Sequence, residues 1–279
     1  MDNNESKNIN LNSLKETAYK SPLNLEKRIA IYEFTKPHYE INKTVLENLN
    51  LRENDQVLDV GCGKGNFILF ASSLYPQAGF VGVDVSLGMF KKASEELSSK
   101  KNISFKTADA QNLPFPNHSF DKIVAMHLLK HVPKIELALS EMARVQRPDG
   151  LTVITANSQN SRPTLNFLEE EVSKNLGLRK FDNLNRRFNN ENGLPMIKKY
   201  YKEVRMIPYE SRLVLNDPQP YVDYFDSIRD FFKSLPTDKQ WAESLAFVRK
   251  YIQNEIEKKG SFEESSIFGV FVASGPKAG

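Results

Sequence analysis

Residues 57–66 read VLDVGCGKGN and decide the fold of this chain of 279 residues. Residues 56–60 are an apolar run between turn-forming residues, which is typical of a buried strand in a parallel sheet. Glycines follow at 61, 63 and 65, and the next stretch, FILFASSLY, has helical spacing. Strand, glycine turn and helix bring backbone N–H groups and a helix N-terminus close to a ligand. The stretch therefore predicts an α/β fold with a ligand site at the turn.

The spacing of these glycines separates the common nucleotide sites. A dinucleotide-binding turn has the pattern GxGxxG, and Asn66 stands where its third glycine would be. A P-loop ends in Gly-Lys-Ser/Thr, whereas Lys64 is followed by Gly65. The pattern is instead GxGxG, preceded by the acid Asp59. These residues disfavour a nicotinamide dehydrogenase, and a tight turn without a ligand remains the structural alternative.

Composition excludes several classes of protein. The 38 basic and 35 acidic residues leave a net charge of +3, which does not indicate a nucleic-acid surface. No apolar run approaches the roughly 20 residues that cross a bilayer, and the first residues lack a signal-peptide pattern. The single cysteine, Cys62, excludes an internal disulfide and a cysteine-rich zinc site. We expect a cytoplasmic monomer or homodimer with no membrane partner and no metal.

A strand that ends in an acid and is followed by GxGxG resembles the first motif of the class I S-adenosylmethionine-dependent methyltransferases. The resemblance is to the small-molecule type with a methyltransferase-11/25-like core, and it covers residues 24–157 well and the remainder loosely. It implies a Rossmann-like, doubly wound sheet of seven strands, mostly parallel with an antiparallel last strand. It also implies S-adenosylmethionine as cofactor and S-adenosylhomocysteine as product.

Two further acids fit this resemblance. Asp84 ends the predicted strand 79–83, and an acid at the tip of the second strand lies beside the glycine turn. A carboxylate there can accept hydrogen bonds from both ribose hydroxyls, although a plain turn residue is the alternative. Asp109 follows the third strand, where family members contact the adenine amino group. The expected cofactor-binding residues are Asp59, Gly61, Cys62, Gly63, Asp84, Val85, Met89, Asp109, Ala110, Met126 and Arg28.

His127 and His131 are the candidates for a general base. Both follow the predicted strand 121–126, and open α/β sheets place their chemistry at the carboxyl ends of strands. A neutral imidazole there could take a proton from a nucleophile, because its pKa lies near neutrality. Packing or a hydrogen bond to the backbone is the alternative for each.

The remaining sequence predicts the organisation of the chain. We expect a disordered tail at 1–18, a cofactor-binding core with N-terminal helices at 19–158, and a helix and sixth strand at 159–215. A helical cap at 216–262 separates the last two strands, and 263–279 hold the last strand. That separation far exceeds a hairpin loop of about 2–5 residues. Packing is the alternative for each aromatic candidate for substrate contact: Tyr19, Tyr32, Tyr221, Tyr224 and Phe225.

Exclusion favours a small organic acceptor, methylated on O, N or C. Methylation of pyrimidine C5 or of arsenic uses cysteines, and the motif of enzymes acting on exocyclic amino groups is replaced by MHLL at 126–129. Two alternatives remain. One is a methyltransferase for RNA or another macromolecule, with a basic patch at Lys198, Lys199, Lys202 and Arg205. The other is a binder, cyclase or lyase that uses S-adenosylmethionine without transferring methyl.

Overall fold

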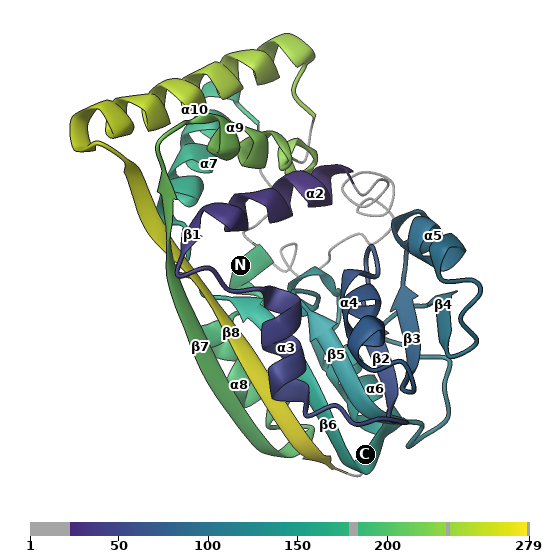
Figure 1. Cartoon of the computed structure of the whole chain (residues 1–279). Coiled ribbons are helices and arrows are strands. Elements are labelled where there is room, and N and C mark those ends of the chain that lie inside the picture. The colour runs from purple at the N-terminus through teal and green to yellow at the C-terminus, as the bar shows by residue number, and fades with distance from the viewer. Residues whose placement is uncertain (1–22, 179–183, 233–234, 278–279) are drawn as a thin grey trace.

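The centre of the molecule is a mixed eight-stranded sheet with strand order β1-β7-β8-β6-β5-β2-β3-β4. The computed structural model describes residues 23–178, 184–232 and 235–277 (Figure 1). Strands β2 to β6 are parallel to one another, and β8 runs antiparallel to both of its neighbours. The bounds of the parallel strands are Gln56–Val60 (β2), Gly79–Asp84 (β3), Ile103–Thr107 (β4), Phe120–Met126 (β5) and Gln146–Asn157 (β6). The Rossmann-like α/β class is confirmed.

The predicted strand count was wrong by one. The additional strand, β1 (Thr35–Lys36), pairs antiparallel with β7 (Tyr201–Leu215) and forms the edge of the sheet. Two residues are too few to show the alternating pattern by which a strand is recognised in sequence. The last two strands therefore do not form the edge, and β8 (Phe262–Pro276) lies between β6 and β7.

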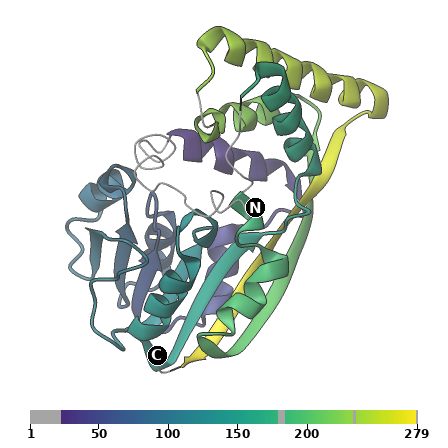
Figure 2. The same ribbon diagram turned by 180° about the vertical axis from the view of Figure 1, so that it is seen from behind.

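Helices cover both faces of the sheet (Figures 1 and 2). Successive residues of a strand point to opposite faces, so Val57 and Leu58 belong to two different hydrophobic cores. Burial on both faces explains why β2 reads as a continuous apolar run. The helices that flank the sheet are α3 (Ile41–Leu49), α4 (Asn66–Leu74), α5 (Leu87–Glu96), α6 (Ile135–Val145) and α8 (Asn190–Ile197).

The hairpin of β7 and β8 extends beyond the rest of the sheet and carries the cap. The hairpin is paired from Tyr201 and Pro276 to Leu215 and Phe262, whereas β6 pairs with β8 only over residues 151–157. We call residues 216–261, which connect the end of β7 to the start of β8, the cap. Because β8 begins at Phe262, the inserted segment ends one residue earlier than expected. Its elements are α9 (Gln219–Asp226), η5 (Arg229–Phe231) and α10 (Asp238–Lys259), against which α7 (Pro163–Leu176) packs.

Helix α2 (Leu23–Ala30), which continues into η2 (Ile31–Phe34), lies between the cap and the sheet (Figure 1). The Nζ of Lys27 donates to Asp226 Oδ2 at 2.6 Å, and the side-chain amide of Asn24 donates to Asp230 Oδ2 at 2.9 Å. Ile31 enters the hydrophobic core of the cap. Helix α2 is thus attached to the cap and forms part of the wall over the carboxyl ends of the parallel strands.

Asp121 of β5 stabilises the opposite end of the sheet. Its Oδ2 accepts the backbone N–H of Gln56 at 2.8 Å and pairs with Arg147 Nη1 at 2.5 Å. The carboxylate thus satisfies the first N–H of β2 and joins β5 to the start of β6.

Candidate active site

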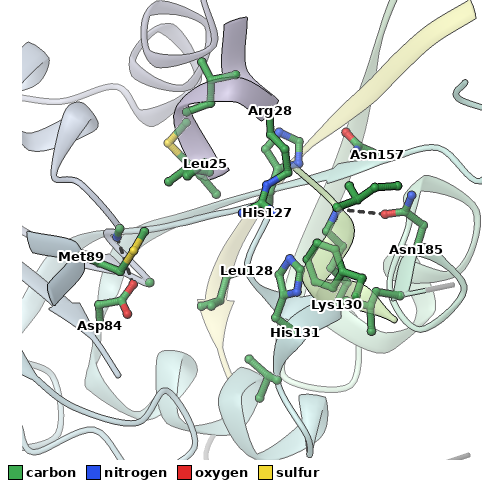
Figure 3. A pocket seen from close by; sticks show the side chains of 18 of the residues that line it. Leu25, Arg28, Asp84, Met89, His127, Leu128, Lys130, His131, Asn157 and Asn185 are labelled. Carbon is green, nitrogen blue, oxygen red and sulfur yellow. Dashed lines mark hydrogen bonds between the residues drawn. The ribbon is translucent and has the colours of Figure 1, made fainter. Parts of the chain in front are cut away.

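A cavity of about 340 Å³ lies between the carboxyl ends of the parallel strands and the cap (Figure 3). Its volume falls in the range of roughly 300–1,000 Å³ that is common for ligand sites. One end is formed by the glycine turn and Asp84, and the other by α2, the segment after β5 and the cap. Most of the predicted residues line it: Arg28, Tyr32, Gly61, Gly63, Asp84, Val85, Met89, Asp109, Ala110, Met126, His127, His131 and Tyr224.

The glycine turn forms the floor of one end. Gly61 and Gly63 have φ angles of +71° and +52°, a region that residues with a Cβ rarely adopt. A Cβ at Gly61 would lie 2.6 Å from Leu128 Cδ1. A Cβ at Gly63 would meet only Leu25 Cδ2 at 3.7 Å and Met89 Cε at 4.0 Å, both in the cavity wall. Packing thus requires glycine at 61, whereas at 63 glycine keeps space open for a ligand.

Asp84 ends β3 beside this turn. Its Oδ2 accepts the N–H of Gly63 at 3.1 Å, and its Oδ1 accepts the N–H of Ser86 at 3.0 Å. The carboxylate thus fixes the turn to β3 while it lines the cavity. At the neighbouring strand end, Asp109 Oδ1 accepts the backbone N–H of Gln111 at 2.9 Å. Two carboxylates are therefore held in place at the glycine-turn end.

Asp59 and Cys62 are not among the residues that line the cavity, unlike most of the other residues expected to bind the cofactor. Asp59 is still within β2, where it pairs with Gly82 on one side and Val124 on the other, and it is only 2% exposed. Burial and the nearby charge of Asp84 raise the pKa of Asp59 to about 7. Burial also raises the pKa of the Cys62 thiol. Both residues are buried, and the Cys62 Sγ lies 4.0 Å from the carbonyl oxygen of Gly63 in the turn.

His127 and His131 line the part of the cavity next to the cap (Figure 3). The N–H of His127 donates to Thr155 O at 3.1 Å, and its buried Nδ1 has no hydrogen-bond partner in the part of the chain that the structure describes. Burial, with Lys130 and Arg162 nearby, lowers the pKa of His127 to about 3. Burial and Lys130 also hold the pKa of His131 well below its usual value. Both imidazoles are therefore neutral at pH 7.

Two cations line the same end of the cavity. Lys130, which sequence reasoning missed, donates from Nζ to Asn185 Oδ1 at 2.9 Å. Burial and the charges of Arg28 and Arg162 lower the pKa of Lys130 to about 8. Arg28 donates from Nη1 to the carbonyl of Ser227 at 3.1 Å. The signal for Lys130 was present, because it lies between the two candidate histidines just past a strand end.

Arg162 lies behind the cavity wall and was also missed. It is 5% exposed, and its Cζ lies 4.5 Å from the ring centroids of both Tyr32 and Tyr224. Neither Nη1 nor Nη2 has a hydrogen-bond partner among residues 23–178, 184–232 and 235–277. Tyr32 belongs to η2 and Tyr224 to α9, so the guanidinium of Arg162 connects η2 to the cap. No local pattern predicts this contact, because the three residues are far apart in sequence.

Tyr221 and Phe225 do not face the cavity, which corrects their expected role in substrate contact. They are 1% and 0% exposed, one turn apart on the face of α9 that points into the cap. The ring of Phe225 stacks on Trp241 at 5.7 Å. Only Tyr224 of the predicted aromatic residues in the cap lines the cavity. Tyr19 lies outside the described residues.

Comparison with known proteins finds methyltransferases and also a structure described as a [4+2]-cyclase, with a TM-score of 0.53 and 17% identity over 84% of this chain and 80% of that one. A family model described as a methyltransferase domain, methyltransferase-25, matches residues 57–150. A demethylmenaquinone methyltransferase of Staphylococcus aureus is 33% identical over 127 residues, which are 45% of this chain and 53% of that protein. The match therefore spans about half the length of this curated relative.

Two solved structures share the fold over most of the chain. A structure described as a putative methyltransferase from an antibiotic biosynthesis pathway of Anabaena variabilis has a TM-score of 0.60 and 18% identity. The similarity covers 82% of this chain and 95% of that one. A phosphoethanolamine N-methyltransferase 2 of Haemonchus contortus, in complex with S-adenosyl-L-methionine, has a TM-score of 0.54 and 17% identity, over 86% of this chain and 53% of that one. Among the described residues, no helix combines the length and apolarity needed to cross a membrane.

Proposed function

Because residues 57–150 form a class I methyltransferase core of the S-adenosylmethionine-dependent type, we propose that the chain transfers a methyl group from this cofactor to a small organic acceptor. The attacked atom is an O, N or C. One observation carries the proposal: a single cavity joins the glycine turn and Asp84 to a chemically different end beneath the cap. A cavity with two such ends could hold the cofactor at one end and the acceptor at the other.

The residues at the glycine-turn end fit the cofactor. Gly63 leaves room where a Cβ would enter the cavity, and Asp84 holds a carboxylate beside it. We assign the ribose hydroxyls to Asp84 and the adenine amino group to Asp109, because both groups are hydrogen-bond donors that a carboxylate accepts. Val85, Met89, Ala110 and Met126 supply the apolar surface of this end. Asp59 and Cys62 are buried and do not line the cavity.

The cofactor, when bound, supplies a methyl group activated by a positively charged sulfur. The chain's own task is then to align the acceptor and to exclude water. Helix α2 and the cap cover the cavity, and the contacts of Lys27 and Asn24 fasten one to the other. We propose that Tyr32 and Tyr224 form the wall against which the acceptor is positioned.

The histidines are proposed to act as neutral groups. His127 and His131 line the cavity and can each accept a hydrogen bond or a proton from the acceptor. A pKa of about 3 makes His127 a weak base, so we propose that it chiefly orients the acceptor unless a bound anion raises that pKa. An acceptor that is already acidic would need no stronger base.

The cap also favours a small acceptor over a macromolecule. The cavity is roofed by α2 and the cap, whereas the basic patch of the alternative lies on the surface, in the turn between α8 and β7 and at the start of β7. One member of that patch, Lys199, already pairs with Glu136 at 2.5 Å, which reduces its attraction for nucleic acid.

Calorimetric titration of the chain with S-adenosylhomocysteine tests this proposal, with NAD as a parallel control. We expect micromolar binding of S-adenosylhomocysteine alone, and then transfer of labelled methyl to a member of a panel of small acceptors. Binding of NAD alone, or of neither nucleotide, would refute the proposal. Binding without methyl transfer to any member of a broad panel would favour a non-methylating enzyme.

A further inference from the structure

We propose that the cap end of the cavity binds an anionic oxygen group of the acceptor, a carboxylate or a phosphate, between Arg28 and Lys130. This inference rests on the proposed function, because the acceptor is the molecule that would occupy this end. It adds a chemical class to that acceptor: an organic acid or a phosphate ester.

The first argument is that, among the described residues, Arg28 and Lys130 donate hydrogen bonds to neutral acceptors. The Nη1 of Arg28 donates to the carbonyl of Ser227, and its buried Nη2 has no hydrogen-bond partner in the described part of the chain. The Nζ of Lys130 donates to the amide oxygen of Asn185 at 2.9 Å. Both side chains are half-buried. A charge held partly away from water without a counterion is costly, and an anion in the cavity would reduce that cost.

The second argument is the sign of the local field. After burial, the groups that lower the pKa of Lys130 are Arg28 and Arg162, and no carboxylate among the described residues offsets them. The pKa of His131 is lowered by burial and then by Lys130, Arg28, His127 and Arg187. Four cationic side chains of the described residues therefore act on this end. Two of them, Arg162 and Arg187, do not line the cavity, and the charge of Arg162 is partly offset by Glu264.

The carboxylates of the cavity do not cancel this field. Asp84 and Asp109 lie at the glycine-turn end, where each accepts a backbone N–H. Glu169 of α7 also lines the cavity and is 7% exposed, and it has a partner of its own. The pKa values of Lys130, His127 and His131 respond to cations, not to Glu169.

The third argument excludes the opposite class of acceptor. An ammonium group is commonly bound over the faces of aromatic rings. Here Arg162 lies over one face of Tyr32 and one face of Tyr224, with its Cζ 4.5 Å from each ring centroid, and Arg28 Cζ lies 5.3 Å from the centroid of Phe231. The aromatic residues of this end thus hold the chain's own cations, which would repel an amine. They also hold the guanidinium groups in position for an anion.

The test uses three aromatic probes of similar size: benzoate, phenyl phosphate and benzylamine. Each is titrated at constant ionic strength into the full chain, both free and saturated with S-adenosylhomocysteine. We expect at least one of the two anions to bind and benzylamine not to bind. Lys130→Met should weaken anion binding by about tenfold or more, the effect of losing a charged hydrogen bond. The control is Lys250→Met, an exposed lysine of α10, which should change binding less than about twofold.

The outcomes separate the possibilities. Binding of benzoate alone identifies a carboxylate, and binding of phenyl phosphate alone identifies a phosphate. Benzylamine binding, or anion binding that is equal in Lys130→Met and wild type, would overturn the inference. Thermal denaturation checks folding, and Arg28→Gln gives a second measurement at the same site. If the anions behave as expected but S-adenosylhomocysteine does not bind, the proposed function fails and the anion site stands; the reverse pattern refutes only the anion site.

Discussion

Replacing Asp84 by asparagine gives the sharpest test of the cofactor end. The amide has one acceptor oxygen where the carboxylate has two, and it carries no charge. Its NH₂ group would also face either the N–H of Gly63 or that of Ser86, both of which Asp84 now accepts. A hydrogen bond to a charged group contributes about 1.5–3 kcal/mol. We therefore expect Asp84→Asn to weaken binding of S-adenosylhomocysteine by about 2–3 kcal/mol, roughly 30- to 150-fold.

Isothermal titration at pH 7.5 measures this change directly, with Asp149→Asn as the matched control. Asp149 is an exposed carboxylate in the turn at the start of β6 and lies outside the cavity. Its variant should bind within about twofold of wild type. Circular dichroism and thermal denaturation must show that Asp84→Asn is folded. An unchanged dissociation constant in a folded Asp84→Asn protein would refute our assignment of the ribose to this residue.

Three further predictions concern the turn, the buried acid and the cap. Gly63→Ala and its control Gly177→Ala both place a Cβ at a residue with positive φ, and a Cβ at Gly177 would have no neighbour within 4 Å. We expect both variants to lose similar stability, but only Gly63→Ala to lose binding of S-adenosylhomocysteine. Equal binding by the two variants would contradict the inference that Gly63 keeps space open for the ligand. Because folding raises the pKa of Asp59 from 3.8 to about 7, the folded chain binds its proton more tightly, and stability should fall as pH rises through this range. Between pH 5 and pH 8 the free energy of unfolding should fall by about 2–4 kcal/mol, and urea unfolding of Asp59→Asn should lack this fall. An Asp59→Asn protein with the same pH dependence as wild type would argue against the raised pKa. Phe225→Ala should lower the free energy of unfolding by about 3–5 kcal/mol, because Phe225 is fully buried. The control Phe167→Ala should lower it by less than about 1 kcal/mol, because Phe167 is 44% exposed. If Phe225→Ala changed methyl transfer but not stability, Phe225 would contact substrate instead.

Local patterns predicted which residues meet at the glycine-turn end of the cavity, because the geometry there is set by residues close together in sequence. The strand before Gly61, the glycine turn and Asp84 at the tip of β3 are each recognisable within a few residues. The order of parallel strands then brings their carboxyl ends to one edge. The cavity accordingly contains Gly63, Asp84 and Asp109 together.

The cap end was predicted less well, because contacts across the fold determine it. Tyr224 and Phe225 are neighbours in sequence, yet one lines the cavity and the other stacks on Trp241. The rotation of α9 decides between them, and it depends on what the rest of the cap buries. Arg162 and its two tyrosines meet only in the folded chain. The short strand β1 likewise exists only because β7 offers it an edge.

The hairpin of β7 and β8 has a consequence for how the proposed acceptor preference could be altered. The matched domain ends at residue 150, before the cap begins. Residues 216–261 are one contiguous segment that connects the paired ends of β7 and β8. Their exchange would therefore leave the register of the sheet and the glycine turn unchanged. A chimaera that grafts another cap onto strands 201–215 and 262–276 should therefore keep the parent's cofactor affinity. Because Arg28 and Lys130 lie outside the exchanged segment, it should also keep the preference for an anionic group, while the wall to which Tyr224 contributes changes.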